Sequence, residues 1–119
     1  MTEEINPIVY EYVQKSIENI RGQSNHIRKD FFKRYNEIVT LVGYECFKKG
    51  EMKEDVLKEW IIGKHLLSDV AVKRYIKMLI LKKTYDYDEK SKTFRLPQHI
   101  RYRLAETKPT TEASVEDDR

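Results

Sequence analysis

The sequence predicts a mainly α-helical domain that carries one small two-stranded β-hairpin near its C-terminal end. Two observations predict this fold class. Successive segments up to Lys82 repeat apolar residues at helical spacing, and the stretch from Thr84 to Leu96 then changes to twofold alternation. A chain of 119 residues has the length of one ordinary domain and can bury a core without disulfides or metals.

The first two predicted helices begin and end at capping residues. Asn6 followed by Pro7 favours a helix start, and this helix is expected to end near Gly22. A second helix is expected to begin between residues 25 and 30 and to end at Gly50. The apolar stripe of the first helix contains Val9, Val13, Ile17 and Ile20, and that of the second contains Ile27, Phe31, Tyr35, Ile38, Val42 and Cys46.

Two shorter helices follow, joined by a tight connector. The third is expected over about 51–62 and to end at Gly63, with Val56, Leu57, Trp60 and Ile61 facing inward. The connector is expected to contain Lys64 and His65. Ser68 can then cap a fourth helix over 68–82, because its hydroxyl can accept from a free backbone amide. This helix would bury Val72, Ile76, Leu79 and Ile80 and expose Asp69, Lys73, Arg74 and Lys77.

The hairpin alternates aromatic and acidic residues in its first strand and is followed by a proline. Its turn contains Lys90, Ser91 and Lys92 and has no glycine. After Pro97 we expect a short amphipathic helix with Ile100 and Leu104 facing inward, and a disordered acidic tail over 106–119.

The net charge of +3 is unevenly distributed along the chain. Residues 1–20 and 110–119 each sum to −3, which leaves +9 for the centre. Nine basic and four acidic residues lie between 64 and 95. Such a concentration favours a polyanionic partner, and the acidic ends are candidates to screen the basic centre when that partner is absent.

Several other classes of protein are not indicated. The single cysteine, Cys46, lies on an apolar stripe and is expected to be a buried small hydrophobe. No apolar run has membrane-spanning length, and the acidic start does not resemble a signal peptide, so we expect a cytoplasmic protein without membrane contact. His26, His65 and His99 lack metal-ligand spacing. Phosphate-loop and nucleophile motifs are absent from the sequence, so we expect no enzyme, no catalytic residue, no metal and no cofactor.

The segment from about Asp30 to Leu96 resembles the winged helix-turn-helix superfamily of DNA-binding domains. The matching parts are a long helix, two short helices with a tight connector, and a hairpin in the position of the wing. The stretch SDVAVKRYIKML resembles the recognition helix of such regulators. Abundant Lys, Glu, Ile and Tyr with little Gln and Asn is similar to small regulators of hyperthermophilic archaea and their plasmids or viruses. The resemblance implies a DNA-binding domain over 25–105, with the helix within 1–24 as a possible dimerisation element.

This resemblance implies a sequence-specific binder of double-stranded DNA, acting as a dimeric transcriptional regulator. Helix 68–82 would enter the major groove, with Arg74 reading a base edge and with Lys73 and Lys77 contacting phosphates. The further implied contacts are Ser68 through the helix amides, Lys64 and His65 to the backbone, and Lys90, Ser91 and Lys92 to the flanking groove.

The sequence leaves three alternatives open. The basic residues could be an ordinary solvated face. The same fold could serve as a protein-interaction subunit, or as a plasmid-partition or replication-origin binder. The first helix could pack back on its own domain instead of forming a dimer contact.

Overall fold

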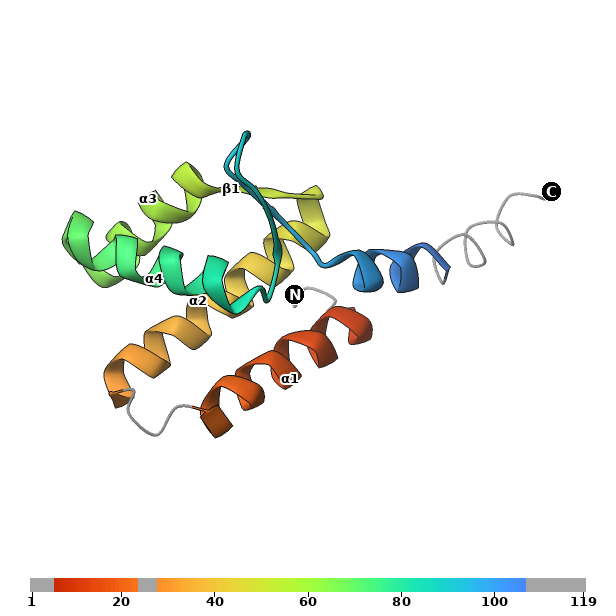
Figure 1. Ribbon diagram of the computed structural model, residues 1–119, viewed down its shortest axis with the longest axis horizontal. Helices are drawn as coiled ribbons and strands as arrows, with labels where there is room; N and C mark the ends of the chain where they lie inside the picture. Colours follow the sequence, from red (N-terminus) through yellow and green to blue (C-terminus); the bar gives the residue numbers. More distant parts are fainter. Residues whose placement is uncertain (1–5, 24–27, 107–119) are drawn as a thin grey trace, which may run out of the picture.

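Five helical segments and a small sheet form the structure, a computed structural model that describes residues 6–23 and 28–106 (Figure 1). The helices are α1 (Pro7–Gln23), α2 (Lys29–Lys49), α3 (Glu54–His65) and α4 (Asp69–Lys82). The strands are β1 (Met52–Lys53), β2 (Asp86–Asp88) and β3 (Thr93–Arg95), and a further helical segment covers residues 98–106. The predicted fold class, mainly helical with a small sheet, is confirmed at this level.

The sheet has three strands, so the prediction of a two-stranded hairpin was incomplete. β1 pairs antiparallel with β3, which pairs antiparallel with β2, giving the order β1-β3-β2. Phe94 in the central strand faces Met52 on one side and Tyr87 on the other. Because β1 occupies residues 52 and 53, α3 begins at Glu54 instead of residue 51.

Three predicted caps are formed as expected. The Asn6 side chain accepts from the amide of Ile8 at 2.9 Å at the start of α1. Gly50 ends α2 in the left-handed conformation with φ 88°, and its amide donates to the Cys46 carbonyl at 2.8 Å. Ser68 precedes α4, and its hydroxyl accepts from the Ala71 amide at 3.2 Å.

The end of α3 was predicted too early. Gly63 lies within the helix, which continues to His65, and Leu66 ends it in the left-handed conformation with φ 54°. Lys64 and His65 therefore lie in the last helical turn, and the connector contains only residues 66–68. Val56, which was expected to face inward, is 52% exposed.

One core joins all the elements. The fully buried side chains include Tyr35, Ile38 and Val42 of α2, Leu57 and Ile61 of α3, Val72 and Leu79 of α4, and Phe94 of β3. The Tyr85 hydroxyl donates to the Val39 carbonyl at 2.5 Å and so ties the start of the hairpin to α2. Cys46 is buried as predicted, and burial raises the pKa of its thiol to about 12.

Helix α1 packs against its own domain. Val9 and Val13 are fully buried, Ile20 is nearly so, and the Tyr12 hydroxyl donates to the Thr84 carbonyl. Figure 1 shows α1 running alongside α2, on the side away from α3 and α4. The apolar stripe that was a candidate dimer contact is thus covered, and a dimer contact through α1 would use its other faces.

The helical segment over 98–106 agrees with the amphipathic helix predicted after Pro97. Ile100 is buried and Leu104 is half-buried. Arg101 donates to the Leu96 carbonyl and forms an ion pair with Asp86 at 2.9 Å. Residues 1–5, the boundary at residue 24 and the acidic tail beyond residue 106 lie outside the described residues, whereas Glu11 and Glu18 of the acidic N-terminal stretch are exposed on α1.

Two glycines inside helices are expected to respond in opposite directions when replaced by Ala. A Cβ atom on Gly43 would lie 2.7 Å from the Tyr85 hydroxyl and 2.8 Å from a methyl group of Val13. Gly43→Ala should therefore lower the free energy of unfolding by about 1–3 kcal/mol, because both neighbours are buried and must move. A Cβ on Gly63 meets nothing within 4 Å. Gly63→Ala should raise the free energy of unfolding by about 0.5–1 kcal/mol, since Ala is the better helix former.

Urea denaturation of the two variants beside the wild type measures both changes. Stabilisation by Gly43→Ala would contradict the close packing of α1, α2 and Tyr85 described above.

Candidate nucleic-acid interface

Helix α4 presents a partly basic outward face. Val72, Ile76 and Leu79 are buried, as predicted, while Lys73, Arg74 and Lys77 are exposed. We call the residues opposite the buried stripe the outward face of α4; they are Val70, Lys73, Arg74, Lys77 and Leu81. Val70 and Leu81 are 67% and 68% exposed, so basic and apolar side chains share this surface.

The three basic side chains of this face differ in their surroundings. Lys73 lies 3.5 Å from the Asp69 carboxylate, one helical turn earlier. Lys77 lies between Val70 and Leu81 at the middle of the face. Arg74 lies at the edge that borders the N-terminal end of α2. Within the described residues, neither Arg74 nor Lys77 forms an ion pair with a carboxylate.

The end of α3 brings Lys64 and His65 to different environments. Lys64 is exposed, and its ammonium lies 5.8 Å from the centre of the Trp60 ring. The side chain of His65 is only 12% exposed and lies 3.3 Å from Glu37 on α2. His65 therefore packs between α3 and α2, and its placement does not support the backbone contact predicted for it.

The turn between β2 and β3 forms the candidate wing. It runs from Glu89 to Lys92. Asp88 organises this turn, because its carboxylate accepts from the Ser91 hydroxyl at 2.7 Å and from the Lys90 amide at 3.3 Å. The Ser91 hydrogen bond also lowers the pKa of the Asp88 carboxyl. In the absence of a glycine, Lys92 takes the left-handed conformation with φ 52°.

The base of the wing is tied to the first turn of α3. The Glu54 amide donates to the Lys92 carbonyl at 2.9 Å, and the Tyr87 hydroxyl donates to the Glu54 carboxylate. Lys90 and Lys92 themselves are exposed. Tyr75 and Tyr87 pack within the protein, on Phe31 and Phe94 respectively.

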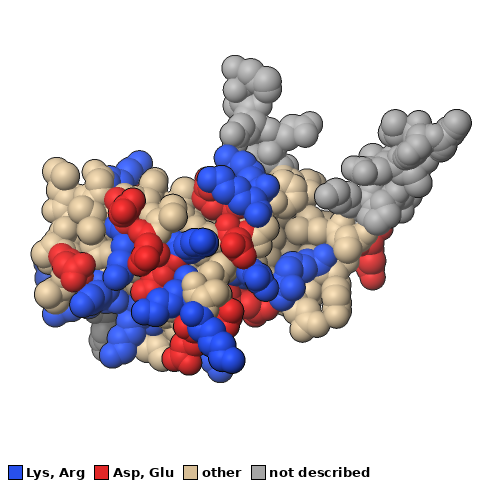
Figure 2. Space-filling model, turned by 90° about the horizontal axis from the view of Figure 1, so that it is seen from above, with Lys and Arg blue, Asp and Glu red and all other residues tan. Residues whose placement is uncertain are grey.

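Charge of both signs covers the side of the molecule from which the wing projects. In Figure 2, which looks onto this side, Lys and Arg are interspersed with Asp and Glu. Among the described residues, Arg95 forms an ion pair with Glu51 at 3.3 Å, and Arg101 forms one with Asp86 at 2.9 Å. The basic excess of the sequence therefore does not form a continuous patch on this side.

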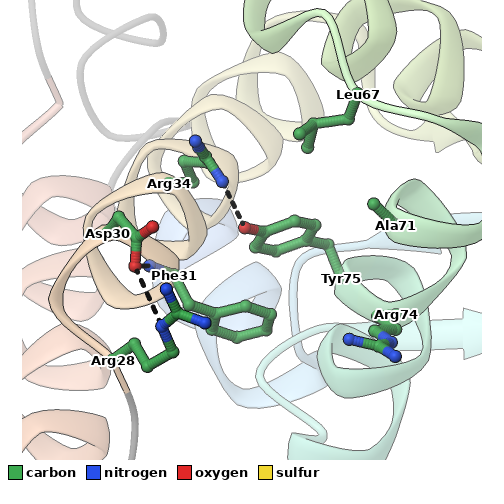
Figure 3. A pocket seen from close by; sticks show the side chains of 8 residues that line it. All are labelled: Arg28, Asp30, Phe31, Arg34, Leu67, Ala71, Arg74 and Tyr75. Carbon is green, nitrogen blue, oxygen red and sulfur yellow. Dashed lines mark hydrogen bonds and ion pairs between the residues drawn. The ribbon is translucent and has the colours of Figure 1, made fainter.

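A pocket of about 210 Å³ lies between the N-terminal end of α2, the connector and α4 (Figure 3). We call it the arginine pocket; it is lined by Arg28, Asp30, Phe31, Arg34, Leu67, Ala71, Arg74 and Tyr75. The Phe31 and Tyr75 rings stack at 4.3 Å between centroids, with an angle of 14° between their planes. Arg34 donates to the Tyr75 hydroxyl at 3.4 Å, and this hydrogen bond raises the pKa of its guanidinium.

Arg28 and Arg34 were not among the site residues predicted from the sequence. They lie 46 and 40 positions before Arg74, so no local spacing connects them to α4. The available signal was the placement of Phe31 and Arg34 one helical turn apart at the start of α2, where the apolar stripe meets a basic side chain.

Within residues 6–23 and 28–106, no three His, Cys, Asp or Glu side chains lie close enough together to hold a metal ion. His26, one of the three histidines considered above, lies outside these residues. In the same part of the chain, none of the helices combines the length and apolar character needed to span a membrane.

Comparisons with protein-family models, with curated proteins and with solved structures found no significant match to this chain. The functional assignment therefore rests on the residues and geometry described above.

Proposed function

We propose that this protein is a cytoplasmic, non-enzymatic binder of double-stranded DNA with a winged helix-turn-helix arrangement. In this proposal α3 and α4 form the helix-turn-helix, α4 enters the major groove, and the turn between β2 and β3 contacts the flanking groove. The connector of three residues, 66–68, fits the short turn of such a motif. The pairing of β1 with β3 fits a wing that is anchored beside the helix pair.

The outward face of α4 is the main observation that supports DNA binding. Arg74 and Lys77 project from a helix whose opposite side is fully packed, and no described carboxylate pairs with either of them. A basic helix held rigidly and outward is the kind of element that the major groove admits. Because Lys77 lies at the middle of this face, it is the best-placed side chain to reach a guanine edge.

Selection of duplexes from a random pool tests this function. A sequence-specific binder should enrich one short motif, and Lys77→Ala should relax the preference at one position of that motif by about 1–3 kcal/mol. If no motif is enriched although duplex is bound, binding is nonspecific and the regulatory role fails.

The wing lysines are expected to contribute affinity without sequence preference. Lys90→Ala and Lys92→Ala should each weaken binding to all duplexes alike, because a lysine at a phosphate contacts no base. Each substitution should also reduce the magnitude of the slope of log K against log salt by about 1. Fluorescence-anisotropy titrations at several salt concentrations measure both effects. Loss of preference instead of affinity would contradict this role for the wing.

We further propose that the protein acts as a homodimeric transcriptional regulator. Two half-sites give a small module the affinity and spacing information that one half-site seldom provides. Sedimentation of the full chain with and without a selected duplex tests this: a stoichiometry of one chain per duplex would exclude the dimer.

A second candidate is a protein-interaction subunit of a transcription, partition or replication machine. The exposed apolar side chains around the connector favour it, since Leu66 is 86% exposed and Val70 is 67% exposed. Leu66→Ser separates the two candidates. This change should leave duplex affinity within about 0.5 kcal/mol of the wild type if α4 binds DNA through its basic side chains, whereas a protein partner held by the connector should be lost.

A further inference from the structure

The arginine pocket concentrates positive charge in a small and partly apolar space. Three guanidinium groups border it, from Arg28, Arg34 and Arg74, against the single carboxylate of Asp30 (Figure 3). Arg28 directly precedes α2, Arg34 lies in α2 and Arg74 lies in α4, so the packing of α4 on the start of α2 brings them together. Arg74, the arginine from α4, also lies at the edge of the outward face of that helix.

Contacts within the pocket fix some groups and leave others free. Arg34 is held by the Tyr75 hydroxyl at 3.4 Å. Asp30 accepts from the Phe31 amide at 2.9 Å and lies 3.8 Å from Arg28. Arg74 forms no ion pair with a carboxylate among the described residues. The Asp30 carboxylate therefore offsets part of the charge of Arg28 and, less strongly, of Arg34. Arg74 has no ion-pair partner in the described part of the chain.

We propose that the arginine pocket binds a phosphate group. Guanidinium groups pair with phosphate oxygens through two parallel hydrogen bonds, which gives arginine its preference for this anion. A volume of about 210 Å³ suits one tetrahedral anion with a few waters, and is below the range of pockets for larger ligands. The stacked rings of Phe31 and Tyr75 and the side chains of Leu67 and Ala71 form the apolar part of the pocket wall, and the charged groups at its rim remain open to solvent.

The phosphate can come from the backbone of a duplex or from a free phosphate in solution. The backbone is the source we favour, and in that form the inference rests on the proposed function. Arg74 connects the pocket to the outward face of α4, so a backbone phosphate bound beside α4 could be shared by Arg74 and Arg34. Arg74 would then contact phosphate instead of the base edge predicted from the sequence.

Titration with inorganic phosphate tests the site without any nucleic acid. In NMR spectra of the full chain, phosphate should shift the side-chain Nε–Hε signals of Arg28, Arg34 and Arg74, while sodium chloride of equal ionic strength should not. Arg34→Gln should weaken this binding by about tenfold, because it removes a charge-assisted hydrogen bond. Lys33→Gln removes the same charge from the neighbouring exposed position of α2 and should leave the affinity within about twofold.

Asp30→Asn provides a test in the opposite direction. Removing this carboxylate should strengthen phosphate binding by roughly threefold, since the asparagine oxygen can still accept from the Phe31 amide. Asp55→Asn is the matched control, because Asp55 also lies in the first turn of a helix and does not line the pocket. Because Asp30→Asn predicts tighter binding, damage to the fold could not produce the expected result.

Binding of Arg34→Gln to a random duplex identifies the source of the phosphate. If Arg34→Gln weakens random-duplex binding about tenfold as well, the site holds a backbone phosphate. If it weakens inorganic phosphate alone, the site is supported with a free phosphate as its ligand. The site is also supported if wild-type protein binds phosphate there but binds no duplex, which would reject the proposed function only. Phosphate shifts that are scattered over surface lysines and unchanged in Arg34→Gln would overturn the site, and the function would stand if Lys90→Ala and Lys92→Ala still weakened duplex binding.

Discussion

The Phe94→Ala variant is expected to lose about 3–5 kcal/mol of its free energy of unfolding. Phe94 is fully buried in β3, the central strand of the sheet, and its ring lies 4.9 Å from that of Tyr87. It also faces Met52 of β1, so one side chain joins both edge strands to the core. Removal of the Phe94 ring would leave a cavity beneath the sheet. The three paired strands cannot close this cavity without losing their hydrogen bonds to one another.

Chemical denaturation monitored by circular dichroism measures this loss. Tyr102→Ala is the matched control, because Tyr102 is an aromatic residue that is 61% exposed. The control should change the free energy of unfolding by no more than about 0.5 kcal/mol. Equal losses in the two variants would show that Phe94 is not at the centre of the sheet.

Replacing Arg74 with Ala is expected to weaken duplex binding by about 1.5–3 kcal/mol, the range for a hydrogen bond to a charged group. Because Arg74 borders the arginine pocket at the edge of α4, we expect the loss to be the same for a selected motif and for random sequence. Lys77→Ala, by contrast, should alter the motif, because Lys77 lies at the middle of the outward face.

Anisotropy titrations with the selected and the random duplex measure both outcomes. Lys49→Ala serves as the control, since Lys49 is an exposed residue at the opposite end of α2 and pairs with Glu45 at 3.2 Å. If Arg74→Ala lost affinity only for the selected motif, Arg74 would be a base-reading residue, as predicted from the sequence. Unchanged affinity for both duplexes would remove Arg74 from the interface.

The helices were predictable from the sequence because their signals are local. Periodic apolar residues and the caps at Asn6, Gly50 and Ser68 act within one or two helical turns, and each of these caps is formed. The end of α3 was predicted wrongly at Gly63, because a glycine can lie inside a helix as well as after it. A Cβ atom added at Gly63 would meet nothing within 4 Å, so no close contact requires a glycine there. Leu66, with no local signal for a positive φ, ends α3 in its place.

The features that escaped prediction depend on contacts between distant residues. β1 contains two residues, Met52 and Lys53, and becomes a strand only through its pairing with β3 about forty positions later. The arginine pocket likewise needs the packing of α2 against α4, which places Phe31 on Tyr75. The covered position of His65 depends on Glu37 of α2 in the same way. In all three cases, tertiary contacts and not the local sequence pattern determine which structure these residues adopt.

The salt dependence of binding to a random duplex tests the central proposal most directly. If Arg34 and Arg74 share one phosphate and Lys90 and Lys92 each neutralise one more, log K should fall against log salt with a slope of about −2.7 for one bound chain. Micromolar affinity at physiological salt that follows this slope is the result we expect. No binding at low salt, or binding whose affinity does not change with salt, would contradict DNA binding by α4 and the wing.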